Sequence, residues 1–294
     1  MRKKLIAILI IMLMSGSITE AGVLPGLADV DLFHVSARAE AATEVTINDE
    51  KALIKTLYQT LLSREEKITI KHSIPDYRID LNDLLAKVYD IDDEKTAKDS
   101  DYLKFSIESW GYSGKTIGNN ATLNFRFTYK TTLKEEKEVD KKVKSALKGM
   151  ELEDASDYEK VKKIHDYIIK RVSYDNTLKK VSAYDALIDK SAVCEGYSML
   201  AYRMFTEAGL KCKIIVGTGN GGPHAWNIVK VEDKWYNIDL TWDDPISSDG
   251  KPMLVYDFFL KSTKDFKDHK RYEEYKAEEF VKTYPISKTS YKMK

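Results

Sequence analysis

Two cysteines with different surroundings are the first residues in this sequence that could do chemistry. Cys194 lies in SAVCEGYSMLAYRMF, where apolar residues recur at three- and four-residue spacing and Gly209 stands where a helix would end. This pattern places Cys194 at a helix N-terminus, where the helix dipole and unpaired amides favour thiolate over thiol. Cys212 lies in KCKIIVG, a run typical of a buried strand. A reactive Cys194 and a structural Cys194, bonded or not to Cys212, both fit these positions.

A nucleophilic thiolate needs an imidazole partner, and the sequence offers five histidines. His34 falls in the expected leader or linker, and His72 in a polar strand-like stretch. His165 lies on the helix pattern DYEKVKKIHDYIIKRV, where we expect a histidine at the edge of the core with its hydrogen bonds satisfied. His269 lies in KDFKDHKRYEE, where we expect it to be solvated. His224 is therefore the best candidate for the base.

A hairpin brings a carboxylate to His224. HAWNIVKV and KWYNIDL alternate as strands, with a turn between them. If Val231 pairs with Lys234, Asp239 lies diagonally across from His224 on the same face, within side-chain reach. Asp243 and Asp244 are the alternative carboxylates, but they precede Pro245 and are expected in a loop that leaves the strand.

The segments CEGYS, GTGNGGP, HAWN and WYNIDLTWDD together resemble the transglutaminase-like superfamily, specifically its bacterial exported members, whose core is similar to papain-type cysteine proteases. The resemblance extends upstream through DYEKVKKIHDYIIKRVSYDN and SAYDAL and covers roughly residues 135–270. It implies an α+β fold with a nucleophile helix packed on an antiparallel sheet. It also implies a nucleophile at Cys194, a general base at His224 and an orienting acid at Asp239.

Further residues near this centre are candidates for contact with the substrate or the oxyanion. The backbone amide of Cys194 is one expected oxyanion donor, and the Tyr184 hydroxyl is the candidate for the second. Trp226 and Trp242 are expected near the site, with packing as the alternative role for all three aromatic residues. Glu195 is expected to make a structural or substrate contact. The glycine-rich GTGNGGP is expected to be a mobile loop beside the site.

The chemistry expected from these residues is attack on a peptide or side-chain amide through a thioester, with hydrolysis favoured over cross-linking. A protein-glutamine transglutaminase and a non-catalytic cell-surface binding module are the alternatives. The sequence contains no HExxH, CxxC, Walker or GxGxxG motif, so no cofactor or metal is expected. Lys plus Arg and Asp plus Glu number 47 each, which argues against a nucleic-acid partner. The expected partner is a peptide or protein substrate, with a cell-wall-associated substrate among the candidates.

The remaining segments predict an exported protein of two folded units. Residues 1–21 have a signal-peptide layout, with cleavage after Ala21 or as late as residue 41; an uncleaved membrane anchor is the alternative. Residues 22–43 are expected to be a linker, 44–133 a small α+β domain, 134–270 the catalytic domain and 271–294 a C-terminal extension. Within them we expect a helix over 44–62, a strand in TLNFRFTYKT, an amphipathic helix in LKEEKEVDKKVKSALKGM, a capping box of Ser156 and Glu159, and a strand in YDFFLKS.

Overall fold

The computed structural model describes residues 43–73, 80–91, 100–118, 120–245 and 253–292. The predictions of a signal peptide and a linker therefore fall almost entirely outside the described residues. Among the helices of the described ranges, none combines the length and apolarity needed to cross a bilayer. The described elements mix helices with mainly antiparallel sheets, which confirms the α+β class.

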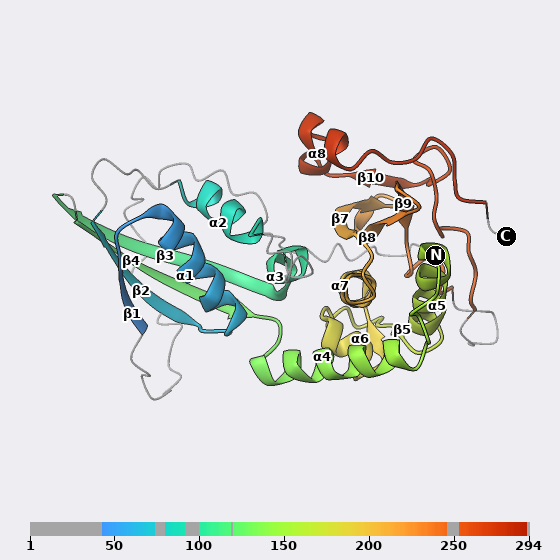
Figure 1. Cartoon of the computed structure of the whole chain (residues 1–294), viewed down its shortest axis with the longest axis horizontal. Coiled ribbons are helices and arrows are strands. Elements are labelled where there is room, and N and C mark those ends of the chain that lie inside the picture. The colour runs from blue at the N-terminus through green and yellow to red at the C-terminus, as the bar shows by residue number, and fades with distance from the viewer. Residues whose placement is uncertain (1–42, 74–79, 92–99, 119, 246–252, 293–294) are drawn as a thin grey trace, which may run out of the picture.

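The first unit is a four-stranded sheet with helices on one face (Figure 1). The strand order is β1-β2-β4-β3, in which β1 and β2 are parallel and the other neighbours antiparallel. Its elements are β1 (Thr43–Ile47), α1 (Glu50–Leu62), β2 (Lys67–Ser73), α2 (Leu81–Tyr89), α3 (Ser100–Ser106), β3 (Ile107–Ile117) and β4 (Asn120–Tyr129). Leu123, Phe125 and Phe127 are buried along β4, as alternation requires of a half-buried strand, so the predicted strand is confirmed.

The helix expected over residues 44–62 is shorter than predicted. Its first residues form β1, which pairs with β2, and α1 begins only at Glu50. Asp49 caps the helix by accepting a hydrogen bond from the Ala52 amide at 2.7 Å. The β-branched run of β1 precedes this cap, and the pairing partner that makes it a strand lies more than twenty residues along the chain.

The second unit packs helices against a sheet of order β10-β7-β8-β9 (Figure 1). Its elements are α4 (Leu133–Lys148), α5 (Asp157–Ile169), β5 (Ser173–Tyr174), α6 (Ala183–Leu187), β6 (Ser191–Ala192), α7 (Cys194–Glu207), β7 (Cys212–Gly219), β8 (Gly222–Val231), β9 (Lys234–Ile238), β10 (His269–Arg271), the 3-10 helix η1 (Glu273–Lys276) and α8 (Glu278–Thr283). The helix α7 is buried along most of its length and packs on β7 and β8. This packing fixes the start of α7 against one end of the sheet.

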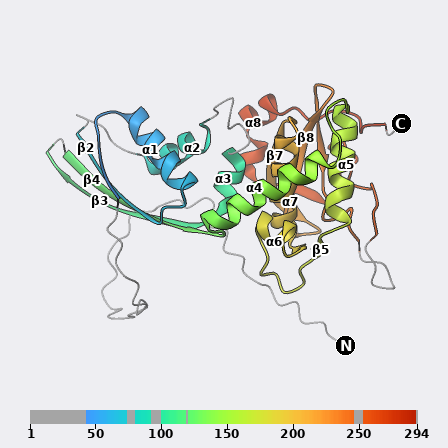
Figure 2. The same cartoon turned by 60° about the horizontal axis from the view of Figure 1, so that its bottom comes forward.

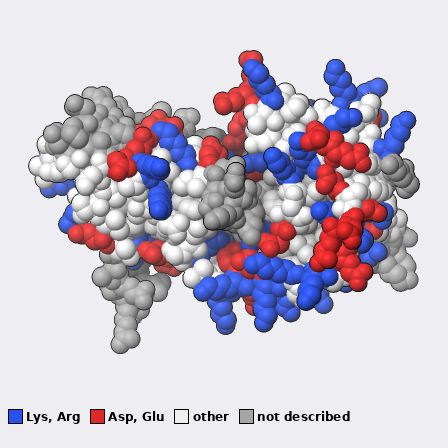
Figure 3. Space-filling view, viewed as in Figure 1, with Lys and Arg blue, Asp and Glu red and all other residues white. Residues whose placement is uncertain are grey.

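The amphipathic helix α4 leaves the first unit and runs along the second, beside α6 and α7 (Figure 2). Its buried stripe is Val139, Val143 and Leu147, and a capping box at Thr132 begins it. Its lysine side chains are exposed and gather over the helix in the space-filling view (Figure 3). The predicted amphipathic helix is therefore confirmed, as is the capping box of Ser156 and Glu159 at the start of α5.

The glycine-rich segment GTGNGGP was expected to be a loop, but most of it lies within strands. Gly219 pairs with Gly222, and Asn220 and Gly221 form a two-residue hairpin turn with φ of 49° and 82°. A Cβ at Gly219 would lie 2.8 Å from Trp242 and 3.0 Å from the His224 ring. A glycine is therefore needed there for close packing beside His224.

The strand expected in YDFFLKS is wrong. Residues 257–260 form turns, and only an isolated bridge joins Lys261 to Asn237. The additional strand of this region is β10, which pairs antiparallel with the edge of β7. Residues of the expected C-terminal extension pack on the second unit, where Tyr284 meets Trp235 and Tyr291 stacks on Tyr158.

Candidate active site

Cys194 is the first residue of α7, as the sequence predicts. Its N-cap, Val193, offers no side chain to cap the helix, so the first amides of α7 have no side-chain acceptor. The short parallel pair β5–β6 ends immediately before the thiol, with Tyr174 opposite Ala192. Both cysteines are free; Cys194 is partly exposed and Cys212 is buried. The structure thus gives no disulfide, and it leaves one thiol accessible at a helix start.

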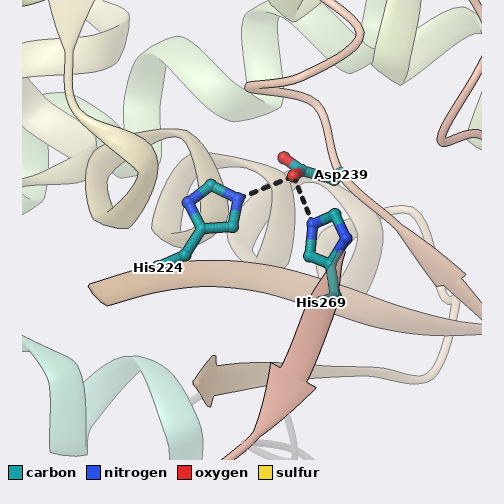
Figure 4. Close-up of side chains that lie close together, drawn as sticks. All are labelled: His224, Asp239 and His269. Carbon is teal, nitrogen blue, oxygen red and sulfur yellow. Dashed lines mark hydrogen bonds and ion pairs between the residues drawn. The ribbon is translucent and has the colours of Figure 1, made fainter. Parts of the chain in front are cut away.

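The hairpin of β8 and β9 has the register that the sequence predicts. Val231 pairs with Lys234, β9 ends at Ile238, and Asp239 follows directly. His224 lies near the start of β8, and its Nε2 is 2.7 Å from Asp239 Oδ2 (Figure 4). Cys194 is among the groups whose interactions raise the pKa of His224, so the thiol lies close to the same imidazole. The structure therefore brings Cys194, His224 and Asp239 together, although they are distant along the chain.

Asp239 is fixed by four hydrogen-bond donors. The backbone amides of Thr241 and Trp242 donate to Oδ1 at 2.9 and 3.2 Å. His224 and His269 both direct Nε2 at Oδ2 (Figure 4). An ionised carboxylate only accepts hydrogen bonds, so Nε2 of His224 carries a proton. The neutral imidazole consequently has its lone pair on Nδ1, the nitrogen that remains for the thiol.

The charges and hydrogen bonds around His224 and Asp239 favour a protonated imidazole beside an ionised carboxylate. Burial opposes protonation of His224, but the charge of Asp239, its hydrogen bond and the hydrogen bond with Cys194 raise the pKa of His224 to about 10. Burial also opposes ionisation of Asp239, yet the charges and hydrogen bonds of His224 and His269 lower the pKa of Asp239 to about 2. The imidazole is therefore poised to hold a proton that it takes from the thiol.

The alternative carboxylates serve other partners. Asp243 Oδ2 lies 3.1 Å from Nε2 of His165, and the Tyr197 hydroxyl donates to Asp244 at 2.6 Å. His165 is fully buried and hydrogen bonded on both ring nitrogens, which confirms the prediction of a satisfied histidine although it lies inside the core rather than at its edge. These contacts hold α5 and α7 to the segment that follows Asp239.

The prediction of a solvated His269 is wrong. Its side chain is 1% exposed, and its Nε2 lies 3.0 Å from Asp239 Oδ2. The charged residues around His269 suggest a surface loop, but β10 pairs with β7 and directs the His269 side chain inward. A strand of three polar residues shows no alternation, so the sequence carried no signal for this position.

The two tryptophans pack around the histidines, which is the alternative role stated for them. The ring centroid of Trp242 lies 5.2 Å from that of His224, and the Trp226 centroid lies 6.1 Å away. Glu195 forms an ion pair with Lys130, which is a structural contact. It therefore ties the nucleophile helix to the residue that follows β4.

Tyr174, which was not singled out from the sequence, lies near the nucleophile, whereas the oxyanion contact expected for Tyr184 stays a prediction. Burial raises the pKa of Tyr184, and so do the carboxylates of Glu138, Glu135, Asp189 and Asp185. Burial also raises the pKa of Tyr174, followed by the negative charges of Cys194, Asp175 and Asp239. Tyr174 pairs with Ala192, which lies two residues before the thiol. Its signal was SYDN at the end of the upstream resemblance, and it was missed because two residues are too few to show a strand pattern.

Three of these side chains also have the donor types of a transition-metal site. Ligand atoms of His224, Asp239 and His269 lie within 4.8 Å of one another. The contacts at 2.7 and 3.0 Å are hydrogen-bond distances that need a proton between the atoms, whereas a metal needs bare lone pairs. The arrangement is therefore that of a hydrogen-bonded network.

Comparison with known proteins shows which sequences and structures this chain is similar to. Residues 144–240 match the family model described as the transglutaminase-like superfamily. The mouse kyphoscoliosis peptidase is 27% identical over 124 residues, which are 35% of this chain and 19% of that protein. The human kyphoscoliosis peptidase is 30% identical over 105 residues, which are 30% of this chain and 16% of that protein. This chain thus spans less than a fifth of the length of these relatives. A solved structure described as a TGase superimposes with a TM-score of 0.35 and 19% identity, over 62% of this chain and 56% of the other.

Proposed function

We propose, from the premise that residues 144–240 belong to the transglutaminase-like superfamily, that this chain is a cysteine enzyme acting on peptide or side-chain amides. Cys194 is the nucleophile, His224 the general base and Asp239 the group that orients it. The observation that carries the proposal is the saturation of Asp239 by four donors, which leaves Nδ1 of His224 as the acceptor for the thiol proton.

The reaction follows from this geometry in two halves. The Cys194 thiolate attacks the carbonyl carbon, a C–S bond forms, and the carbonyl electron pair moves onto oxygen. When the intermediate collapses, the C–N bond breaks and the leaving amine takes the proton from His224 Nδ1. A water molecule then gives a proton to His224 while its oxygen attacks the thioester carbon; the C–S bond breaks, the acid is released and the Cys194 sulfur leaves as a thiolate beside the protonated His224.

The uncapped start of α7 supports an oxyanion site. The Cys194 amide is at the first helical position, where the helix offers it no acceptor and Val193 supplies none. We assign the second contact to the Tyr174 hydroxyl, because Tyr174 pairs with Ala192, two residues before the nucleophile. Replacing Tyr174 with phenylalanine should lower amide turnover, whereas Tyr184→Phe should not.

Within this class, hydrolysis is favoured over cross-linking. Water is the most abundant nucleophile at a partly exposed thiol, and transfer to an amine requires a site that excludes water. A protein-glutamine transglutaminase is the alternative. A secreted or cell-surface location and a peptide substrate associated with the cell wall are the setting that the N-terminal residues favour.

Thiol alkylation followed by acyl trapping tests the proposal. Iodoacetamide should modify Cys194 at pH 6 to 7 much faster than it modifies a model thiol, while Cys212, buried and with its thiol pKa raised by burial, stays unmodified. A peptide library incubated with the chain should then leave an acyl group on Cys194, and a fluorescent primary amine added in excess reports transfer against hydrolysis.

Cys194→Ala is the matched variant and should abolish both readouts. Slow alkylation of Cys194 together with no acyl adduct would instead support a non-catalytic binding module.

A further inference from the structure

We propose that His269 is a positioning residue of this centre: a buried imidazolium that donates to Asp239 and holds its carboxylate in place for His224. The proposal rests on the proposed function of Cys194, His224 and Asp239. Three independent features of the ring support it, namely its hydrogen-bond partners, its aromatic surroundings and the charges that it meets.

Both ring nitrogens of His269 face oxygen acceptors. Nε2 lies 3.0 Å from Asp239 Oδ2, and Nδ1 lies 2.9 Å from the Lys267 carbonyl oxygen. A neutral imidazole has one N–H donor, so one of these contacts would place two lone pairs against each other. The doubly protonated ring satisfies both. The Lys267 carbonyl oxygen cannot donate a hydrogen bond. Asp239 already accepts from three other donors, so the site favours the ionised state of the Asp239 carboxyl.

The ring lies in a cage of aromatic side chains. Its centroid is 3.9 Å from that of Phe266, 4.3 Å from Trp242, 5.0 Å from Trp226 and 5.4 Å from Phe258. Aromatic faces attract a cation at these separations, most strongly when the cation is removed from water. The side chain is 1% exposed, so this attraction is not screened by solvent.

The Asp239 carboxylate is the negative charge that the His269 ring meets, and this carboxylate is 1% exposed. A buried charge is unfavourable unless an opposite charge faces it, and a protonated His269 supplies one beside His224. The pocket on the far side of the ring is lined by Lys270, Arg271 and Lys276 and by no acidic side chain among the described residues. Asp239 is therefore the carboxylate that the ring faces.

Nitrogen-15 NMR of the histidine rings tests the protonation state without any substrate. At pH 7 both ring nitrogens of His269 should show imidazolium shifts, assigned by comparison with His269→Gln. The imidazolium signal should be lost in Asp239→Asn, because the acceptor on Nε2 changes. A neutral His269 ring in the wild-type chain at pH 7 would overturn the proposal, and it would do so even if amide turnover were never detected.

The pH profile of Cys194 alkylation separates positioning from a merely structural role. Gln places an amide nitrogen where His269 has Nε2, so His269→Gln keeps the donor and removes the charge, whereas His269→Leu removes both. Loss of one positive charge should move the pH profile of the alkylation rate to higher pH, on both its low-pH and its high-pH side (its two limbs), in either variant. His269→Leu should in addition lower the maximal rate about tenfold, as expected for loss of a hydrogen bond to a charged group, and His269→Gln should recover most of that rate.

If the pH profile of alkylation does not shift in either variant, and the rate falls only in proportion to the loss of thermal stability, His269 has a structural role alone. An absence of fast alkylation in the wild-type chain would instead count against the proposed function, and the NMR result would still decide the state of His269.

Discussion

Replacing Asp239 with asparagine is the most direct test of how this centre works. The change keeps the size of the side chain but not its hydrogen-bond capacity, because a carboxamide has one oxygen acceptor and one NH2 donor. Four donors converge on Asp239: the amides of Thr241 and Trp242 on one oxygen, and His224 and His269 on the other. In either orientation the asparagine NH2 group therefore faces two donors.

The magnitude follows from the pKa of His224. If the asparagine oxygen faces the backbone amides, His224 Nε2 must become an acceptor, so its proton moves to Nδ1 and the ring can no longer take the Cys194 proton. Raising the pKa of His224 from 6.5 to about 10 corresponds to roughly 5 kcal/mol in favour of the imidazolium. Part of this comes from Cys194, so we expect Asp239→Asn to lose about 4 kcal/mol, or about 10³-fold in kcat/KM.

Iodoacetamide alkylation of Cys194 measures the effect without a known substrate. The rate at pH 6.5, followed by mass spectrometry of the Cys194 peptide, should fall strongly in Asp239→Asn. Asp244→Asn is the matched control, because it makes the same change in a buried carboxyl that bonds Tyr197 rather than His224. If Asp239→Asn reacts within a few-fold of the wild-type rate at every pH, the tautomer argument is incorrect.

Three further changes test the surrounding structure. Burial raises the pKa of Asp244 to about 6, so the folded protein binds this proton more tightly than the unfolded chain, and stability falls as the pH rises from 3.8 through 6. Asp244→Asn should remove this pH dependence and add as much as about 3 kcal/mol to the free energy of unfolding at pH 7, measured by urea unfolding. Gly217→Ala puts a Cβ 2.1 Å from the Lys270 carbonyl oxygen, so β10 should shift, with a loss of about 2 kcal/mol and slower Cys194 alkylation; unchanged unfolding would refute the register. Ser156→Ala should lose about 1 kcal/mol in thermal unfolding with no change in alkylation, and an altered rate would contradict a purely local role for that cap.

Much of the candidate site follows from local patterns in the sequence. The apolar spacing after Cys194 predicts a helix that starts at the thiol, and the alternation on either side of the Glu232 turn predicts the hairpin and its register. Given that register, Asp239 has to come close to His224, because residues on one face of an antiparallel pair keep fixed neighbours. These features depend on residues that lie near one another in the chain, so periodicity can reveal them.

Tertiary structure alone decided which other side chains join them. His269 meets Asp239 across 30 residues, through a three-residue strand added to the edge of β7, and Tyr174 reaches the thiol through a two-residue strand. Strands this short carry no periodic pattern, and their place is set by the partner that supplies the missing backbone hydrogen bonds. The sequence by itself therefore determines the thiol, the imidazole and the carboxylate, whereas packing of distant segments determines what surrounds and orients them.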